Sequence, residues 1–149
     1  MTTQTASEEA NKELVRTEME KLLEQRDFEF VDDIYAETVE IRTRRAGGRP
    51  VVSREDLKSL YAEWTDAFPD LTVEIHAELA DGDLVVQQVT LRGTHEGTFR
   101  GVEPTGAVID IDGFHLREIR DGTIVATSSV AEMATLMTQL GLDLPFDAM

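Results

Sequence analysis

The chain has 149 residues and carries 30 Asp and Glu against 14 Lys and Arg, a formal net charge of −16. A field of this sign repels nucleic acid and anionic lipid, so we predict neither nucleic acid nor a membrane as a partner. The chain contains no Cys, which excludes disulfides, thiol catalysis and Cys-ligated metal sites. Its length suits one domain over residues 1–149 with a core of its own.

The start of the chain is polar and acidic. Residues 1–13 lack the basic patch and the apolar run of a signal peptide. Nowhere in the chain do about 18 apolar residues follow one another, so no membrane-spanning segment is predicted. These features favour a cytoplasmic protein whose residues 1–7 form a flexible tail.

Apolar residues at helical spacing predict three helices in the first half of the chain. They cover residues 8–25, 27–35 and 53–68, and Ser53 is well suited to cap the third. Residues 37–43 alternate as a strand, and a loop containing Gly and Pro follows over residues 44–50.

After Pro69 the period of the apolar residues changes to two, which is typical of strands. We predict strands over residues 71–79, 84–99, 107–119 and 123–130, a last helix over 131–140, and an apolar-acidic tail over 142–149 that folds back on the body. Helices followed by consecutive long strands predict an α+β fold, in which a strongly curved, mostly antiparallel sheet wraps around the N-terminal helices and leaves a central pocket.

The basic residues are mostly Arg. Only Lys12, Lys21 and Lys58 are lysines, while carboxylates are scattered along the whole chain. This balance resembles cytosolic proteins of extreme halophiles, where molar salt screens the repulsion between surface carboxylates. We therefore predict a halophilic protein with an acidic surface, from a haloarchaeon; the alternative is an ordinary acidic protein.

Five short sequence strings occur in a characteristic order along the chain. They are Ala67-Phe68-Pro69-Asp70, Gly93-Thr94-His95-Glu96-Gly97, Pro104-Thr105-Gly106, Gly113-Phe114-His115 and Arg120-Asp121-Gly122-Thr123-Ile124-Val125. Together with the order of the elements, they resemble the SnoaL-like polyketide cyclase family of the nuclear-transport-factor-2-like superfamily, from about Glu8 to Leu142. The resemblance implies a cone-shaped fold over an apolar pocket, and a homodimer formed through the sheet.

The resemblance also implies a chemistry. The cyclases of this family close a ring by intramolecular aldol condensation without metal or organic cofactor, using an Asp in an apolar pocket as general acid/base. The family motif Glu-His-Trp-Asp-Val falls on residues 126–130, which read Ala-Thr-Ser-Ser-Val, so the Asp position is Ser129. A serine hydroxyl needs a partner to move protons at neutral pH. Either another residue supplies the base, or the protein only binds its ligand.

Three residues are candidates for a catalytic role. His115 shares the strand phase of Ile109, Ile111 and Ile119, so we expect it to face the pocket, as a general base or as an ordinary buried histidine. Ser129 would be its hydrogen-bond partner. Glu132 would be a substitute carboxylate, or a first-turn residue that favours the helix dipole. The spacing of the His residues predicts no metal site.

The aromatic residues of the helices complete the predicted site. Trp64, Phe68, Tyr61 and Phe28 are expected to line the pocket beside His115, or else to form ordinary core. We predict a protein that binds a small, mostly apolar carbonyl compound without any cofactor, with cyclase- or isomerase-type activity open. The alternative is a non-catalytic small-molecule-binding or dimeric interaction protein of the same fold.

Overall fold

A curved six-stranded sheet forms the centre of the structure, a computed structural model that describes residues 6–43, 48 and 50–144. Its strands lie in the order β2-β1-β6-β5-β4-β3. Their bounds are Tyr35–Ile41 (β1), Val51–Ser53 (β2), Thr72–Asp81 (β3), Leu84–Thr94 (β4), Val108–Arg120 (β5) and Thr123–Ala131 (β6). Neighbouring strands are antiparallel except β1 and β6, which are parallel.

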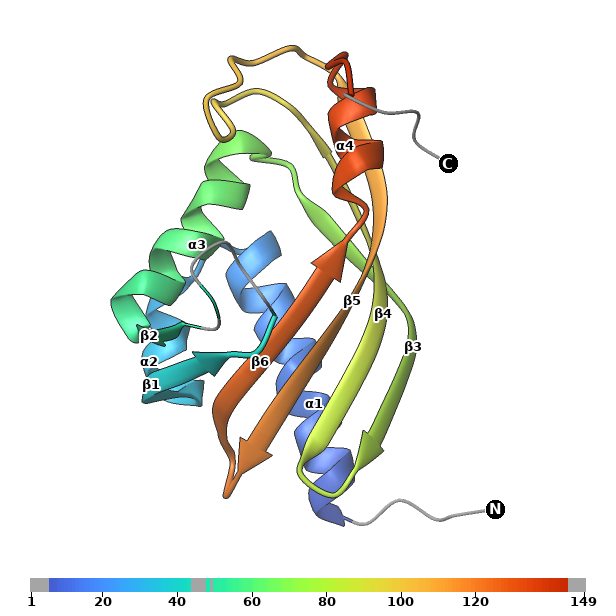
Figure 1. Cartoon of the computed structure of the whole chain (residues 1–149). Coiled ribbons are helices and arrows are strands. Elements are labelled where there is room, and N and C mark those ends of the chain that lie inside the picture. Colours follow the sequence, from blue (N-terminus) through green and yellow to red (C-terminus); the bar gives the residue numbers. More distant parts are fainter. Residues whose placement is uncertain (1–5, 44–47, 49, 145–149) are drawn as a thin grey trace.

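The helices lie mainly on one side of this sheet (Figure 1). Helix α1 covers Ala6–Met19 and continues into a π-helical segment over Glu20–Glu24. A 3-10 turn, Phe28–Phe30, leads into the short α2, Val31–Ile34, and α3 covers Arg54–Ala67. Helix α4, Met133–Gln139, packs against β5 at the upper end of the sheet in Figure 1. The predicted α+β fold with a curved, mostly antiparallel sheet is therefore confirmed.

The start of α3 follows from local hydrogen bonds. The Ser53 Oγ accepts from the Asp56 N–H at 3.1 Å, and the Asp56 carboxylate accepts from the Ser53 N–H at 3.1 Å. This reciprocal pair satisfies two backbone donors that the first helical turn leaves unpaired. The predicted helix start at Ser53 is confirmed.

Other predicted boundaries are wrong. The strand β2 was not predicted, because three residues are too few for a periodic signal. The predicted helix over 27–35 is a 3-10 turn plus α2, and Tyr35 already opens β1. The predicted strand over 84–99 ends at Thr94. Beyond it the chain leaves the sheet, and the amides of Glu96 and Gly97 both donate to the Ala67 carbonyl at the end of α3, at 3.0 and 3.1 Å.

Three predicted segments fall partly outside the described residues. Residues 1–5 of the predicted N-terminal tail lie outside them, while Ala6 and Ser7 belong to α1. Residues 44–47 and 49 of the predicted loop and residues 145–149 of the predicted C-terminal tail also lie outside. In the part of the chain that the structure describes, no helix has the length and apolar character needed to cross a membrane.

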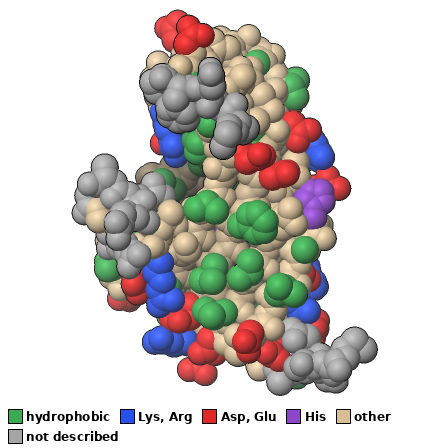
Figure 2. Space-filling model, turned by 45° about the vertical axis from the view of Figure 1, so that its right-hand side comes forward, with side chains coloured by type: hydrophobic (Ala, Val, Ile, Leu, Met, Phe, Trp, Pro, Cys, Tyr) green, Lys and Arg blue, Asp and Glu red, His purple; other side chains and the backbone are tan. Residues whose placement is uncertain are grey.

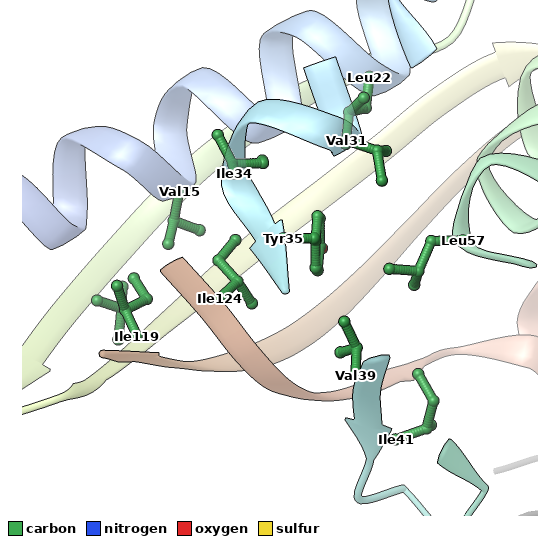
Figure 3. Packing of buried hydrophobic residues seen from close by; sticks show 11 residues of the cluster. Val15, Leu22, Val31, Ile34, Tyr35, Val39, Ile41, Leu57, Ile119 and Ile124 are labelled. Atoms are coloured by element: carbon green, nitrogen blue, oxygen red, sulfur yellow. The ribbon is translucent and has the colours of Figure 1, made fainter. Parts of the chain in front are cut away.

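Buried apolar side chains form two clusters. The first joins the helices to β1, β5 and β6, and Figure 3 shows its side chains converging between these elements, from Val15 of α1 to Ile124 of β6. The second lies around Phe68, Phe99 and the buried face of α4. Figure 1 places α4 near the upper end of the sheet. Each cluster contributes walls to the cavity described below.

The face of the sheet turned away from the helices carries exposed apolar side chains. Successive residues of a strand point to opposite faces, so the residues next to the inward-facing His115 point outward. The cross-strand pairs Leu79↔Val86, Val86↔Leu116 and Phe114↔Val130 place five apolar residues on this side. Of these, Leu79, Phe114 and Val130 are 73%, 50% and 58% exposed. We call these five residues the outer patch; Figure 2 shows apolar side chains gathered on this face, with carboxylates around them.

Candidate functional site

A cavity of about 330 Å³ lies between the inner face of the sheet and helix α3. Strands β1, β4, β5 and β6 form one side, and the other side comes from α3 and from the end of the first helical segment. Its apolar walls are built largely from Met19, Leu23, Ile41, Leu57, Leu60, Leu71, Val89, Leu91 and Met133. This volume is in the range of pockets for small organic ligands.

Four of the predicted site residues line this cavity. Tyr61 and Trp64 reach it from α3, His115 from β5 and Ser129 from β6. His115 and Ser129 are direct neighbours across the β5–β6 pair. Ser129 is solvent-exposed, so the cavity wall meets solvent at this position.

The other predicted aromatic residues lie elsewhere. Phe68 is completely buried in the second cluster, with its ring 6.0 Å from that of Trp64. Phe28 is half-buried in the 3-10 turn before α2. Neither belongs to the described residues that line the cavity.

Glu132 does not bring a carboxylate to the cavity. It stands at the N-cap of α4, where its Oε1 accepts from the Asp112 N–H at 2.7 Å. Its own N–H donates to the Asp112 carbonyl at 3.0 Å. These two hydrogen bonds hold Glu132 on the backbone of β5, and it is not among the described lining residues.

A chain of polar side chains orients His115. Its Nε2 lies 2.7 Å from the Gln87 Oε1, and the Gln87 Nε2 donates to Glu78 at 3.2 Å. Glu78 is also paired with Arg16 of α1. Because a carboxylate only accepts, the amide nitrogen of Gln87 faces Glu78 and its oxygen faces His115. This network assigns the imidazole proton to Nε2 and leaves Nδ1 unprotonated.

The surroundings of His115 keep its ring uncharged. Burial, and then the positive charge of Arg117, lower the pKa of His115 from 6.5 to about 3. At neutral pH the imidazole is therefore neutral and forms hydrogen bonds without carrying charge. An imidazole with so low a pKa is a weak base, so it abstracts protons poorly. The role of His115 as general base stays a prediction.

A buried ion pair forms one wall of the cavity. The Glu18 carboxylate is completely buried, and the Arg117 Nε donates to its two oxygens at 3.1 and 3.2 Å. The Tyr61 hydroxyl donates to the same carboxylate at 2.6 Å, and the Tyr35 hydroxyl donates to it as well. Burial, together with the charge of Glu18, raises the pKa of both tyrosines. Both phenols therefore stay protonated and remain donors.

This ion pair was not predicted from the sequence, although the phases of the two elements indicate it. Arg117 shares the strand phase of His115 and Ile119, and Glu18 shares the buried face of α1 with Val15 and Met19. A charged residue at a core position is almost never fully buried unless it is paired. Two such residues on elements that pack together therefore predict an internal ion pair.

Hydrogen-bond donors gather on the wall around Arg117. The Arg117 Nη1 donates to the Ser129 Oγ at 3.4 Å, and the Ser129 N–H donates to the Thr43 Oγ1 at 2.7 Å. Thr43 and Thr127 line the same cavity. This set can bind and polarise a ligand oxygen, whereas no Asp or Glu is among the described lining residues. The described residues contain no group of three potential ligands for a metal ion.

Comparison with known proteins identifies the family. The model of the SnoaL-like polyketide cyclase family matches residues 13–140 of the chain. The chain belongs to this family. No curated protein is similar enough in sequence to this SnoaL-like chain to count as a match.

Solved structures share the SnoaL-like fold over most of their length. A candidate SnoaL-like polyketide cyclase from Jannaschia sp. CCS1 has a TM-score of 0.86 at 20% identity, over 97% of this chain and 100% of that one. IdmH, a candidate polyketide cyclase from Streptomyces antibioticus, has a TM-score of 0.75 at 26% identity, over 89% of this chain and 99% of that one. AclR, a candidate hydroxylase from Streptomyces galilaeus, has a TM-score of 0.79 at 27% identity, over 95% of this chain and 86% of that one. These likenesses agree with the α+β fold described above.

Proposed function

We propose that this SnoaL-like protein binds a small, mostly apolar carbonyl compound in the cavity, with the carbonyl oxygen against Arg117 and Ser129. The observation that carries the proposal is the division of the cavity wall. One part is aliphatic and aromatic, and the donors are concentrated around the buried guanidinium. Small-molecule sites commonly combine an apolar lining with a few convergent polar groups that orient the ligand.

The proposal is binding, without a commitment to ring closure. The residue at the position of the family's acid/base Asp is Ser129, whose hydroxyl donates or accepts hydrogen bonds but does not ionise at neutral pH. His115 is a neutral imidazole of low pKa, and Glu132 is held on the backbone of β5. A cofactor-free cyclase or isomerase would have to use His115 and Ser129 alone, so the non-catalytic alternative is the better supported.

A pair of probes that differ in one carbonyl tests the proposal. By isothermal titration calorimetry, 2-acetylnaphthalene is expected to bind about tenfold more tightly than 2-ethylnaphthalene, because hydrogen bonds to a charged group contribute about 1.5–3 kcal/mol. Ser129→Ala should reduce this preference. Thr123→Ala, at the other end of β6 and not among the described lining residues, should leave it unchanged. Equal affinity of the wild-type protein for the two probes would contradict the proposal.

We also propose a homodimer formed through the outer patch. An apolar area in the middle of an exposed sheet face is a feature of protein interfaces. The mixed charges beside it, with Arg92 between Glu74 and Asp110, can pair with those of a second copy across a two-fold axis. The resemblance to the family gives the same expectation. The variant that tests this proposal is described in the Discussion.

The acidic composition supports a third proposal, a cytoplasmic protein adapted to high salt. At about 0.1 M salt the Debye length is about 10 Å, and at about 1 M it is about 3 Å, so surface carboxylates repel each other far less at the higher concentration. With a net charge of −16, the melting temperature is expected to rise steeply over this range of KCl. Circular dichroism measures it, with sucrose as the uncharged control. A flat KCl profile would contradict this explanation of the composition.

A further inference from the structure

The charged residues that line the cavity are basic, whereas most charged residues of the chain are acidic. Carboxylates outnumber basic residues by 30 to 14 in the sequence. Among the described residues that line the cavity, however, the ionisable side chains are Arg100, Arg117, His115, Tyr35 and Tyr61, and none is an Asp or Glu. In so acidic a protein, a cavity wall with two guanidinium groups and no carboxylate indicates a ligand of negative charge.

The position of Arg117 directs its charge toward the cavity. Its carboxylate partner Glu18 has no exposed surface and is not among the described lining residues, whereas Arg117 lines the cavity itself. The guanidinium uses Nε for Glu18 and turns Nη1 toward the exposed Ser129. The buried pair therefore presents its positive end to the ligand space. A charge in such a partly dry site acts more strongly than it would in water.

The second guanidinium is held on aromatic rings. Arg100 lies in the loop over residues 95–107, at the upper end of β5 in Figure 1. Its guanidinium carbon is 4.9 Å from the ring centre of Phe99 and 6.0 Å from that of Trp64, a residue of the cavity wall. Its Nε donates to Glu63 of α3 at 3.0 Å. These contacts hold a second guanidinium at the cavity, while its partner Glu63 is not among the described lining residues.

The low pKa of His115 supports this view of the electrostatics. Burial is the larger cause, but the charge of Arg117 also lowers it, so the positive field of Arg117 acts inside the cavity although Glu18 lies behind it. The neutral imidazole neither repels a cation nor attracts an anion. Each guanidinium is paired with a carboxylate, Arg117 with Glu18 and Arg100 with Glu63, but neither carboxylate is among the described lining residues, so the positive end of each pair faces the ligand space.

We propose that the ligand of this cavity is an apolar compound that carries a carboxylate, with the carboxylate against Arg117 and Ser129 and the apolar part against Tyr61, Trp64 and the aliphatic wall. This inference rests on the proposed binding function and deepens it, because it names the charge of the ligand. A carboxylate accepts charge-assisted hydrogen bonds from a guanidinium and a further one from a serine hydroxyl. A neutral carbonyl forms the same contacts more weakly.

Two probes with the same aromatic body separate this inference from the proposed function. Isothermal titration calorimetry with 2-naphthoate and methyl 2-naphthoate, at one fixed salt concentration, is expected to give at least about tenfold tighter binding of the anion. The indole NMR signal of Trp64, the only Trp in the chain, should shift with either probe and so place both in the cavity. Equal affinities, or tighter binding of the ester, would overturn the inference and leave the proposed function standing. If neither probe bound, the proposed function itself would be contradicted.

A charge-free variant completes the test. Removing both buried charges in Glu18→Gln/Arg117→Met avoids leaving one of them unpaired, and circular dichroism checks that the variant folds. In this variant the affinity for 2-naphthoate is expected to fall to about the affinity for the methyl ester. Arg100→Gln, at an exposed position, should weaken 2-naphthoate binding without changing the fold. An unchanged preference in both variants would overturn the assignment of the anion to these residues.

Discussion

Arg117→Met is expected to lower the free energy of unfolding by about 3–5 kcal/mol, because it would leave the Glu18 carboxylate buried without its cation. Glu18 has no exposed surface, and the Arg117 side chain is 5% exposed, so water cannot replace the lost partner. The hydroxyls of Tyr35 and Tyr61 still donate to the carboxylate, but they do not neutralise its charge. Denaturant unfolding followed by circular dichroism measures the effect.

Two comparisons make this prediction specific. Arg26→Met removes an exposed arginine that pairs with Asp66, away from the proposed dimer interface, and exposed pairs contribute about 0–1 kcal/mol. The double variant Glu18→Gln/Arg117→Met should recover part of the loss, since no unpaired charge remains. A cost for Arg117→Met no larger than that of Arg26→Met would show that the Glu18–Arg117 pair is not buried in solution.

The same variant has a second, electrostatic readout. The charge of Arg117 is one of the two causes that lower the pKa of His115, so its removal should raise that pKa above about 3. Burial still acts, so the pKa is expected to stay below the ordinary value of 6.5. An NMR titration of the His115 ring signals measures the change, and an unchanged value would mean that Arg117 lies farther from the ring than described.

Phe114→Asp is expected to weaken the proposed dimer by at least about a hundredfold, because it would bury a charge in the middle of an apolar interface. Phe114 is 50% exposed and pairs with Val130 across the β5–β6 register. In each copy the same patch would face its equivalent, so one substitution introduces two carboxylates that repel each other. Analytical ultracentrifugation over a range of protein concentrations measures the dissociation constant.

The control for this variant lies at the other edge of the sheet. Val51 of β2 is 65% exposed, so Val51→Asp adds the same charge away from the outer patch and should leave the dissociation constant unchanged. Circular dichroism confirms the fold of both variants. A wild-type protein that sediments as a monomer at all concentrations, or a Phe114→Asp protein that dimerises as well as the wild type, would contradict the proposed interface.

Period and capping predicted much of the architecture. The alternation of Ile109, Ile111 and Ile119 with polar residues correctly predicted which face of the long strand β5 is buried, and Ser53 correctly predicted the start of α3. These predictions succeed because the apolar period and the helix cap depend only on residues that are close together in the sequence. The parallel pairing of β1 with β6 depends on contacts between distant segments, which no local pattern carries, and the three residues of β2 are too few for a periodic signal.

The candidate site was predictable only where a residue lies inside a regular element. Tyr61 and Trp64 lie within α3 and His115 within β5, so their phase placed them on the inner side. Phe68 is the C-cap of α3, with φ −127° and ψ 80°, so the helical phase no longer determines its direction. Glu132 likewise precedes the first residue of α4, and its backbone partner comes from β5, which no spacing within its own segment indicates.

The parallel pair of β1 and β6 has a consequence for the order in which the protein folds. These two strands come from opposite ends of the chain, and both line the cavity. On the ribosome the N-terminal helices and β1 emerge early, but β1 has only the short β2 beside it until β6 has been synthesised. Pairing between such distant segments is slow, because a long loop must close first. Because both strands line the cavity, the cavity can form only after β6 has been synthesised, and a ligand then stabilises the folded protein over the unfolded chain.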